Sequence, residues 1–204
     1  MPINSPNYSF FSMSSSIFVA CFQLDVNMKF EKITSTASPL MAQVHGLYMS
    51  AFPAKERRPW ESVTQLVESG SPFFSLIAAT DDNGDFVGFA SLWRLPDTYY
   101  IEHLAVADSC RSKGYGGKIL DYAKMLAGES PLVVEVELPD ANDDAPRRIA
   151  FYERHGLMAM ADFEYYQPPY APGLPDVRLM LMTTRQLPDP MRFVIMLHTL
   201  VYNQ

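Results

Sequence analysis

The sequence predicts an α/β fold in which a mixed, mostly antiparallel twisted sheet of about six to seven strands is flanked by about four helices and followed by a C-terminal helical appendix. Three observations predict this fold. The apolar patterns come in the order strand, two helices, antiparallel meander, and then helix, strand, helix and two strands. A glycine-rich turn joins the last strand of the meander to a helix. The length of 204 residues suits one domain with a substantial core.

The first expected elements are a strand and two helices. Residues 28–33, MKFEKI, alternate apolar and charged side chains, as a half-buried strand does. The helix expected over 38–51 has one apolar face, and Thr36 or Ser38 is expected to cap its N-terminus. A shorter helix is expected over 60–68, after the polar link PAKERRP.

A meander of three strands is expected next. FFSLIAAT (73–80) and FVGFASLWRL (86–95) flank the turn sequence DDNGD, which predicts a hairpin. A third strand, TYYIEHLAV (98–106), follows Pro96.

The second half of the chain alternates helices and strands. A helix over 118–128 is expected to end at Gly128, and PLVVEVELP (131–139) is expected to form a strand. Asp143 or Asp144 is expected to cap a helix over 145–155, which ends before Gly156. LMAMADFEYY and VRLMLMT then predict two closing strands.

These elements predict three parts of the chain. Residues 28–184 form the one folded domain, and residues 1–27 are expected to be a loosely ordered N-terminal extension. Residues 185–204 form the appendix, in which Asp189 opens a helix that is apolar nearly all round. Such a helix must be covered, so it packs on its own domain or on a second copy in a homodimer, and the sequence leaves both open.

Composition and charge exclude several classes of function. A formal net charge of −7 argues against nucleic-acid binding, and no apolar stretch reaches the ~20 residues that cross a membrane. The two cysteines predict no disulfide framework, so a reducing, cytoplasmic location is expected. The histidines and cysteines lack metal-ligand spacing, so no metal is expected.

The segment Cys110–Leu120, CRSKGYGGKIL, carries the strongest functional signal. It fails the phosphate-loop pattern, because Gly117-Lys118 is followed by Ile119 rather than Ser or Thr. It also fails the dinucleotide pattern, whose third glycine would be Ile119. It does satisfy the pattern Arg/Gln-x-x-Gly-x-Gly/Ala, with Arg111, Gly114 and Gly116 at the fixed positions.

With this motif and the order of elements, residues 28–184 resemble the GNAT family of acetyl-CoA-dependent N-acyltransferases. Glycines allow successive N–H groups to face one point, and the helix start adds partial positive charge, so the loop can hold a pyrophosphate without a metal. The other interpretation is a glycine-rich turn with solvated basic residues. The resemblance implies that acetyl-CoA is bound by Leu104, Ala105, Val106, Arg111, Ser112, Lys113, Gly114, Tyr115, Gly116, Gly117 and Lys118.

The resemblance also implies a proton donor in RRIAFYERHGL (147–157). Tyr152 takes the position at which the family commonly has a Tyr facing the thioester sulfur, although a core Tyr with a satisfied hydroxyl would fit the same pattern. The family often has Asn seven residues earlier, where this chain has Ala145, so that contact with the pantetheine arm is lost or supplied otherwise.

A base for the acceptor amine is expected on the strand IEHLAV. Glu102 stands where relatives with a side-chain base often carry it, and it would act directly or through a water. Strand alternation places Glu102 and His103 on opposite faces, so His103 is the less favoured candidate. Either residue could instead be a polar group satisfied within the sheet.

The strand VVEVEL places Glu135 and Glu137 on one face. Two carboxylates on a central strand must be paired or must reach a wet cleft. One hypothesis is an acidic acceptor cleft of Glu102, Glu135 and Glu137 that selects an ammonium group, and the other pairs the last two with Arg147 or Arg148.

Two further segments are expected to edge that cleft. KERRPW (55–60) supplies Arg57 and Arg58 for an acceptor carboxylate, and EYYQPPY (164–170) supplies a rim that includes Tyr170. Each could instead be a solvated loop. Cys110 is not expected to act as a nucleophile, because no His partner is evident.

The sequence therefore predicts an N-acetyltransferase that moves an acetyl group from acetyl-CoA to a primary amine by direct transfer in a ternary complex. The acceptor would be a small molecule or a peptide. The alternative is a catalytically degenerate acyl-CoA-binding sensor or interaction module of the same fold.

Overall fold

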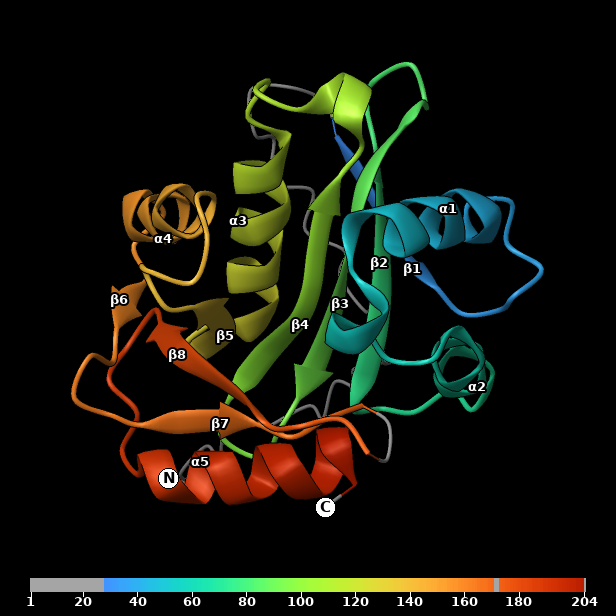
Figure 1. Ribbon diagram of the computed structural model, residues 1–204. Helices are drawn as coiled ribbons and strands as arrows, with labels where there is room; N and C mark the ends of the chain where they lie inside the picture. The colour runs from blue at the N-terminus through green and yellow to red at the C-terminus, as the bar shows by residue number, and fades with distance from the viewer. Residues whose placement is uncertain (1–27, 171–172, 204) are drawn as a thin grey trace, which may run out of the picture.

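The protein folds as one sheet with helices on both faces, seen in a computed structural model that describes residues 28–170 and 173–203 (Figure 1). The expected extension, residues 1–27, lies outside the described residues. The described chain forms eight strands in one sheet. They are β1 Lys29–Ile33, β2 Phe74–Thr80, β3 Phe86–Arg94, β4 Tyr99–Val106, β5 Leu132–Glu137, β6 Met158–Ala159, β7 Tyr165–Gln167 and β8 Val177–Thr183.

Five α-helices accompany the strands in the described residues. They are α1 Met41–Ala51, α2 Trp60–Glu68, α3 Tyr115–Ala127, α4 Ala145–Arg154 and α5 Pro190–Leu197. Short 3-10 turns lie at Ala54–Glu56 and Asp108–Cys110, and a π-helical turn at His198–Tyr202 continues α5. None of the helices in the ranges described is long and apolar enough to span a bilayer. The order of elements agrees with the α/β fold that the sequence predicts.

The strands run in the order β1-β2-β3-β4-β5-β8-β6, with β7 also paired to β8. Neighbours are antiparallel except β4 and β5, which are parallel. In the described chain that parallel ladder has three pairs and ends at Ile101 and Val134. Both strands continue beyond those residues, so they part toward their carboxyl ends. We call this region the β4–β5 split.

The sheet separates two hydrophobic clusters. Helices α1, α2 and α5 cover one face, where Val44, Tyr48, Phe89 and Leu197 are buried. Helices α3 and α4 cover the other face with Ile119, Leu120 and Tyr152, among others. Figure 1 shows α1 and α2 to one side of the long strands and α3 and α4 to the other. Large apolar side chains are thus buried from water on both faces of the sheet, as in a three-layer α/β domain.

The expected helix caps are partly wrong. Leu40 is the residue before α1, and neither expected side chain caps the helix. Thr36 donates to the carboxylate of Glu68, and Ser38 Oγ accepts from the Leu40 N–H at 3.4 Å, before the helix begins. Asn142, not Asp143 or Asp144, supplies the side-chain oxygen before α4, and its Oδ1 accepts from the Asp144 and Ala145 N–H groups.

Two element boundaries also differ from expectation. Helix α3 begins at Tyr115, so Gly116 and Gly117 belong to its first turn rather than to the preceding loop. The segment 157–166 forms two short strands, β6 and β7, instead of one.

The C-terminal helix packs on its own domain. Asp189 caps α5 as expected, with its Oδ1 accepting from the Arg192 N–H at 3.0 Å. Phe193, Leu197 and Val201 are buried in the cluster that α1 and α2 also cover. In Figure 1 the red α5 lies across the lower end of the sheet, beside β7. Residues Pro190–Tyr202, the C-terminal segment from here on, are therefore part of the domain core.

The β3–β4 pairing can be tested at Gly88. A Cβ there would overlap the backbone oxygen of Ala105 and press on Ile119, whereas a Cβ at Gly46 in α1 has nothing within 4 Å. Gly88→Ala should lower the free energy of unfolding by about 1–3 kcal/mol, because backbone atoms must move apart. Gly46→Ala should raise it by up to about 1 kcal/mol, because alanine is the better helix residue. Urea unfolding measures both, and equal effects would contradict this packing.

Candidate active site

A β-bulge lies at the apex of the β4–β5 split. Ser91 pairs with His103 and Leu92 with Ile101, so Glu102 is an extra residue in β4. Bulges bend a strand and increase its local twist. The bulge directly follows the last β4–β5 pair, Ile101 with Val134. It therefore marks the point at which β4 turns away from β5.

The bulge overturns the expected alternation of side chains. Tyr100 and Ala105 belong to the α1/α2 cluster, and Leu104 packs with the α3/α4 cluster. Glu102 and His103 both lie on the α1/α2 face, with His103 Nδ1 3.9 Å from Glu102 Oε2. The expectation that these two neighbours point to opposite faces is wrong, because the extra residue shifts the period by one.

Glu102 is a buried, ionised carboxylate with a cationic partner. Its side chain is 1% exposed, and its Oε1 accepts from Arg58 Nη2 at 2.8 Å and Nε at 3.0 Å. Its Oε2 accepts from Trp93 Nε1 at 2.7 Å. Burial alone would raise the pKa of Glu102, but the Arg58 charge and these donors outweigh it and hold the pKa below its ordinary value.

His103 is neutral and enclosed by aromatic rings. Its Nδ1 lies 3.1 Å from Ser91 Oγ, and its ring makes edge contacts with Tyr48 and Phe52 at centroid distances of 4.9 and 4.7 Å. Burial lowers the pKa of His103, more than the nearby Glu102 charge raises it. A neutral imidazole next to Glu102 can accept a proton or relay one.

Glu135 is the matching residue of β5, one position beyond the last β4–β5 pair. Its carboxylate accepts four hydrogen bonds and has no cationic donor among them. The donors are the Tyr100 hydroxyl at 2.8 Å, the Gln167 amide at 2.8 Å, the Tyr202 hydroxyl at 2.8 Å and the Tyr165 hydroxyl. Burial raises the pKa of Glu135 although these donors act to lower it. Neither Arg147 nor Arg148 donates to it, so the hypothesis that an arginine of α4 pairs with both carboxylates of β5 is wrong for Glu135.

Glu137, at the end of β5, and Tyr152 of α4 both lie near Arg148. Glu137 accepts from Arg148 Nη2 of α4 at 2.7 Å, so the pairing hypothesis is confirmed for Glu137, whose side chain is 26% exposed. Tyr152 of α4 is buried, and its pKa rises to about 12, chiefly through burial, with Arg148 lowering it and Glu137 raising it. The Tyr152 hydroxyl is therefore protonated at neutral pH and can donate a proton or a hydrogen bond.

The glycine loop leads into the N-terminus of α3. Ser112 and Gly114 both have positive φ, +62° and +81°, and Gly114 precedes the first residue of the helix. The first N–H groups of a helix have no acceptor within it, so those of Tyr115 and Gly116 can bind an anion. Arg111, paired with the exposed Asp108, and Lys113 lie at the surface beside them. The loop thus offers free backbone N–H groups and basic side chains of the kind that bind a diphosphate.

Gly117 has a second role in this loop. A Cβ at this position would overlap the imidazole of His155, at the end of α4. Because Gly117 has no side chain, α3 and α4 can approach each other at this point. Lys118 lies with its Nζ 6.0 Å from the Tyr115 ring centroid, on the same turn.

Leu104, Ala105 and Val106 form the end of β4 that borders the split. They pair with β3 on one edge, where Leu104 faces Ala90 and Val106 faces Gly88. The β4–β5 ladder has ended before them, so their other edge faces the split. Backbone groups on that edge can hydrogen-bond an amide chain as an added strand would.

The arginines and the expected rim residue are held inside the chain. Arg57 Nη1 donates to the backbone oxygens of Met49, at 3.0 Å, and Phe52, at the end of α1. Arg58 is occupied by Glu102, and its guanidinium lies 5.4 Å from the Trp93 ring centroid and 5.5 Å from that of the half-buried Tyr170. Neither arginine projects toward solvent as an acceptor-binding side chain would.

Comparison with known proteins identifies the family. The sequence profile of the acetyltransferase (GNAT) family matches residues 41–157, more than half of the chain. The chain belongs to the GNAT acetyltransferase family. The match begins with α1 and ends after α4, so it includes the glycine loop, the β4–β5 split and Tyr152.

Relatives and solved structures agree with this assignment. A GNAT-family acetyltransferase structure from Bacteroides thetaiotaomicron is 31% identical, with a TM-score of 0.78 over 86% of this chain and 99% of that one. A GNAT structure from Elizabethkingia anophelis with acetyl-CoA bound is 16% identical, with a TM-score of 0.53 over 78% and 99% of the two chains, and shows the fold. The uncharacterized N-acetyltransferase YhfO of Bacillus subtilis is 28% identical over 98 residues, 45% of this chain. The match spans 64% of that relative's length.

Sequence reasoning missed most of the partners of the two buried carboxylates in this GNAT domain. Trp93, Tyr100, Tyr165, Gln167 and Tyr202 come from β3, β4, β7 and the C-terminal segment. Each reads as an ordinary core or rim residue in its own segment. The signal that could have found them is the carboxylates themselves, because a buried acid requires donors.

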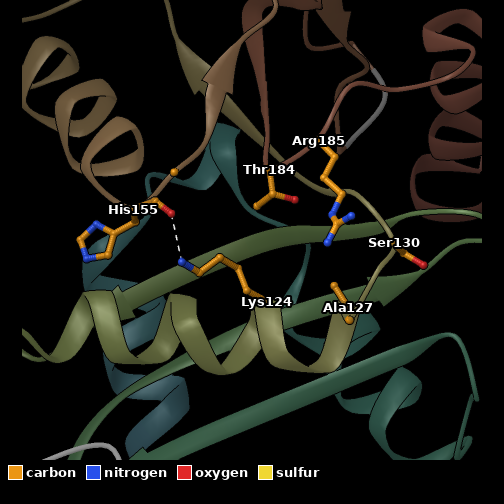
Figure 2. Close-up of a pocket in the computed structure, with 8 residues that line it drawn as sticks. Lys124, Ala127, Ser130, His155, Thr184 and Arg185 are labelled. Atoms are coloured by element: carbon orange, nitrogen blue, oxygen red, sulfur yellow. Dashed lines mark hydrogen bonds between the residues drawn. The ribbon is translucent and has the colours of Figure 1, made fainter.

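A pocket of about 280 Å³ lies at the far end of α3, away from the glycine loop (Figure 2). Its two long cationic side chains already have partners. Lys124 binds Asp121 and the His155 backbone oxygen, and Arg185 pairs with Glu129. Its lining residues do not include any of the candidate active-site residues, so it is a separate pocket.

The buried Arg58–Glu102 pair predicts a pH-dependent loss of stability in Arg58→Met. In the wild type the pKa of Glu102 is lower in the folded than in the unfolded protein. Its ionised carboxylate therefore stabilises the fold above the unfolded-state pKa of about 4.3, and this stabilisation is lost as the pH falls below that value. Without the guanidinium, burial raises that pKa, so the folded variant must bury a charge as pH rises. The variant should be less stable by about 3 kcal/mol or more at pH 7, and the deficit should shrink toward pH 4.

Thermal unfolding between pH 4 and 8 measures this difference. Arg192→Met is the matched control, because Arg192 pairs with Asp97 at the surface, where the two side chains are 63% and 68% exposed. A surface pair should change stability by less than about 1 kcal/mol at any pH. A deficit of Arg58→Met that is the same at pH 4 and pH 7 would contradict the ionised state assigned to Glu102.

Proposed function

We propose that this GNAT protein transfers an acetyl group from acetyl-CoA to a primary amine of a small molecule or peptide, directly in a ternary complex. One observation carries the proposal: β4, which borders the split, leads from Glu102 to a helix N-terminus that could bind an anion, and the protonated Tyr152 lies on the opposite face of the sheet. A thioester donor could lie along the split with its diphosphate at the start of α3.

The donor site would combine backbone groups with the basic side chains of the glycine loop. Acetyl-CoA supplies an acyl group activated as a thioester. The α3 N-terminus and Arg111, Ser112, Lys113 and Lys118 would hold its phosphates. The edge of Leu104–Val106 would bind its pantetheine arm, and a backbone N–H there would stabilise the developing oxyanion.

The acceptor must lose a proton before it attacks. An alkyl ammonium with a pKa near 10 needs about 4 kcal/mol to deprotonate at pH 7. Glu102 is ionised and lies at the apex of the split, with neutral His103 beside it. Because the pKa of Glu102 is low, it is better suited to orient a water or the ammonium group than to keep the proton. We therefore assign it the role of proton relay.

The leaving thiolate must gain a proton. Tyr152 is protonated across the neutral range, because burial raises its pKa to about 12. It lies on the α3/α4 face of the sheet, opposite Glu102. Proton removal and proton donation would then be carried out by different residues on different faces.

The acceptor amine would be held by side chains that border the split. Glu137, 26% exposed, and the half-buried Tyr170 could contact an amine that enters the split. Glu135 would add negative charge at the apex. Arg57 and Arg58 have partners within the chain, so we propose that they hold the site together rather than bind an acceptor carboxylate.

One observation favours the alternative, a domain that binds acyl-CoA without turnover. Ala145, where the family often has Asn, is completely buried at the start of α4 and carries no side-chain donor. A contact with the pantetheine arm would then have to come from elsewhere.

Acetyl-CoA should stabilise the protein against heat. At a hundred times its Kd a ligand adds about 2.7 kcal/mol, which shifts Tm by roughly 5–10 °C for a domain of this size. NAD and ATP at the same concentration should give smaller shifts, because they lack the pantetheine arm. No shift with millimolar acetyl-CoA would contradict the donor site. A shift without thiol release for any amine would favour the alternative.

Tyr152→Phe should lower kcat roughly 100-fold or more, with little change in the KM for acetyl-CoA, because it removes a proton donor and not a binding group. Thiol release measures both constants. The pH profile of the wild type below about pH 10 should show no ionisation of Tyr152, since its pKa is about 12. An unchanged kcat in Tyr152→Phe would remove this residue from the mechanism.

A further inference from the structure

The C-terminal segment lies outside the family match yet reaches the apex of the β4–β5 split. It enters the fold through α5, whose Phe193 and Leu197 are buried, and ends in a π-helical turn. The Asn203 N–H closes that turn on the His198 oxygen, and Asn203 has a φ of +59°. Wide turns of this kind are rare and are found often at functional sites. Here the turn directs two consecutive residues, Val201 and Tyr202, inward.

Val201 contributes its backbone oxygen to the Arg58–Glu102 pair. Arg58 Nη2 donates to that oxygen at 2.6 Å and to Glu102 Oε1 at 2.8 Å. The Arg58 side chain is 8% exposed and Val201 is completely buried. Arg58 therefore joins the C-terminal segment to the carboxylate at the bulge of β4.

Tyr202 contributes its hydroxyl to the second carboxylate. It donates to Glu135 Oε2 at 2.8 Å and accepts from Gln167 Nε2 at 2.8 Å. The hydroxyls of Tyr100 and Tyr170 lie 3.1 and 3.5 Å away. Tyr202 is 7% exposed, so loss of this hydroxyl would leave a buried acid with one donor fewer.

Two neighbouring residues of one segment thus hold the two carboxylates that flank the apex of the split, Glu102 on β4 and Glu135 on β5. A segment that only covered apolar surface would need Phe193, Leu197 and Val201, but not a hydroxyl at position 202.

We propose that the C-terminal segment is part of the acceptor side of the active site, with Tyr202 as a positioning residue that holds Glu135, and Val201 one that holds Arg58 against Glu102. The inference rests on the proposed acetyl transfer. It assigns amine capture to a part of the chain that the family match does not include.

The test compares Tyr202→Phe with the wild type in thiol release over a panel of primary amines. The ring stays, so packing is kept, and only the hydroxyl is lost. We expect kcat/KM for the amine to fall roughly 10-fold or more, the scale of a lost hydrogen bond to a charged group. The KM for acetyl-CoA and the Tm shift that it causes should stay unchanged, because the donor site lies at the other end of the split.

The pH profile of kcat/KM separates a positioning role from a general loss of packing around position 202, because a loss of packing alone would not shift the profile along the pH axis. Glu135 is faced by Tyr100 and Glu102 from β4, Tyr165 from β7, Tyr170 from the following loop and Tyr202. Loss of the Tyr202 donor raises the pKa of Glu135 further. The fall of kcat/KM for the amine at low pH, the acid limb of its pH profile, should therefore begin at a higher pH than in the wild type.

The matched control is Tyr122→Phe. Tyr122 stacks on Phe30 at 4.1 Å on the α3/α4 side of the sheet, away from both carboxylates. This variant should leave the kinetic constants and the acid limb unchanged. Should Tyr202→Phe fail to fold, Gln167→Met, which removes the amide that donates to Glu135 and to the Tyr202 hydroxyl, should give the same loss and the same pH shift.

Three outcomes would overturn the inference. If kcat and KM of Tyr202→Phe equal those of the wild type, the C-terminal segment only covers apolar surface of the domain and does not position the acceptor side. Loss of the acetyl-CoA Tm shift together with activity would show general damage to the fold. Absence of thiol release in the wild type with every amine would refute acetyl transfer itself, and with it any role in positioning an acceptor.

Discussion

The parting of β4 from β5 is the constraint on which the rest of the structure depends. Two parallel strands at the centre of a sheet normally pair along their length, but here the ladder stops after Ile101 and Val134. The extra residue in β4, Glu102, bends the strand away at that point. A backbone edge that is left unpaired must find other hydrogen-bond partners, and a ligand that contains amide groups can supply them.

The same parting places a carboxylate on each strand at its apex, and the chain stabilises the two in different ways. Glu102 is neutralised by the Arg58 charge, so its pKa falls below the ordinary value. Glu135 receives neutral donors, three tyrosine hydroxyls and one amide, and its pKa stays raised by burial. Charge pairing offsets desolvation more completely than neutral hydrogen bonds do. Two acids near each other therefore differ in their affinity for protons, which is how one site can hold a stable anion beside a group that is more readily protonated.

Periodicity and turn residues in the sequence predicted the order of strands and helices, because those signals are local. The glycine loop and its position before α3 were predicted for the same reason. The bulge at Glu102 could not be predicted, since it depends on how β3 and β4 pair, and the letters IEHL read equally well as regular alternation. The partners of Glu135 come from 30 to 67 residues away in sequence, so they are set by tertiary packing alone. Tyr202 in particular looks like one more apolar position in a helix that only needed cover.

The split also explains why the proposed proton donor and proton relay are on opposite faces of the sheet. Tyr152 packs with the α3/α4 cluster, and Glu102 faces α1, α2 and the C-terminal segment. In a continuous sheet the backbone would separate two such side chains. Where β4 and β5 part, no ladder lies between them, so a thioester carbonyl in the gap could be approached by an amine from the Glu102 side while its sulfur faces Tyr152. The attacking amine and the leaving sulfur would then lie on opposite faces of the sheet. The glycine loop at the end of β4 would determine where along the gap the carbonyl lies.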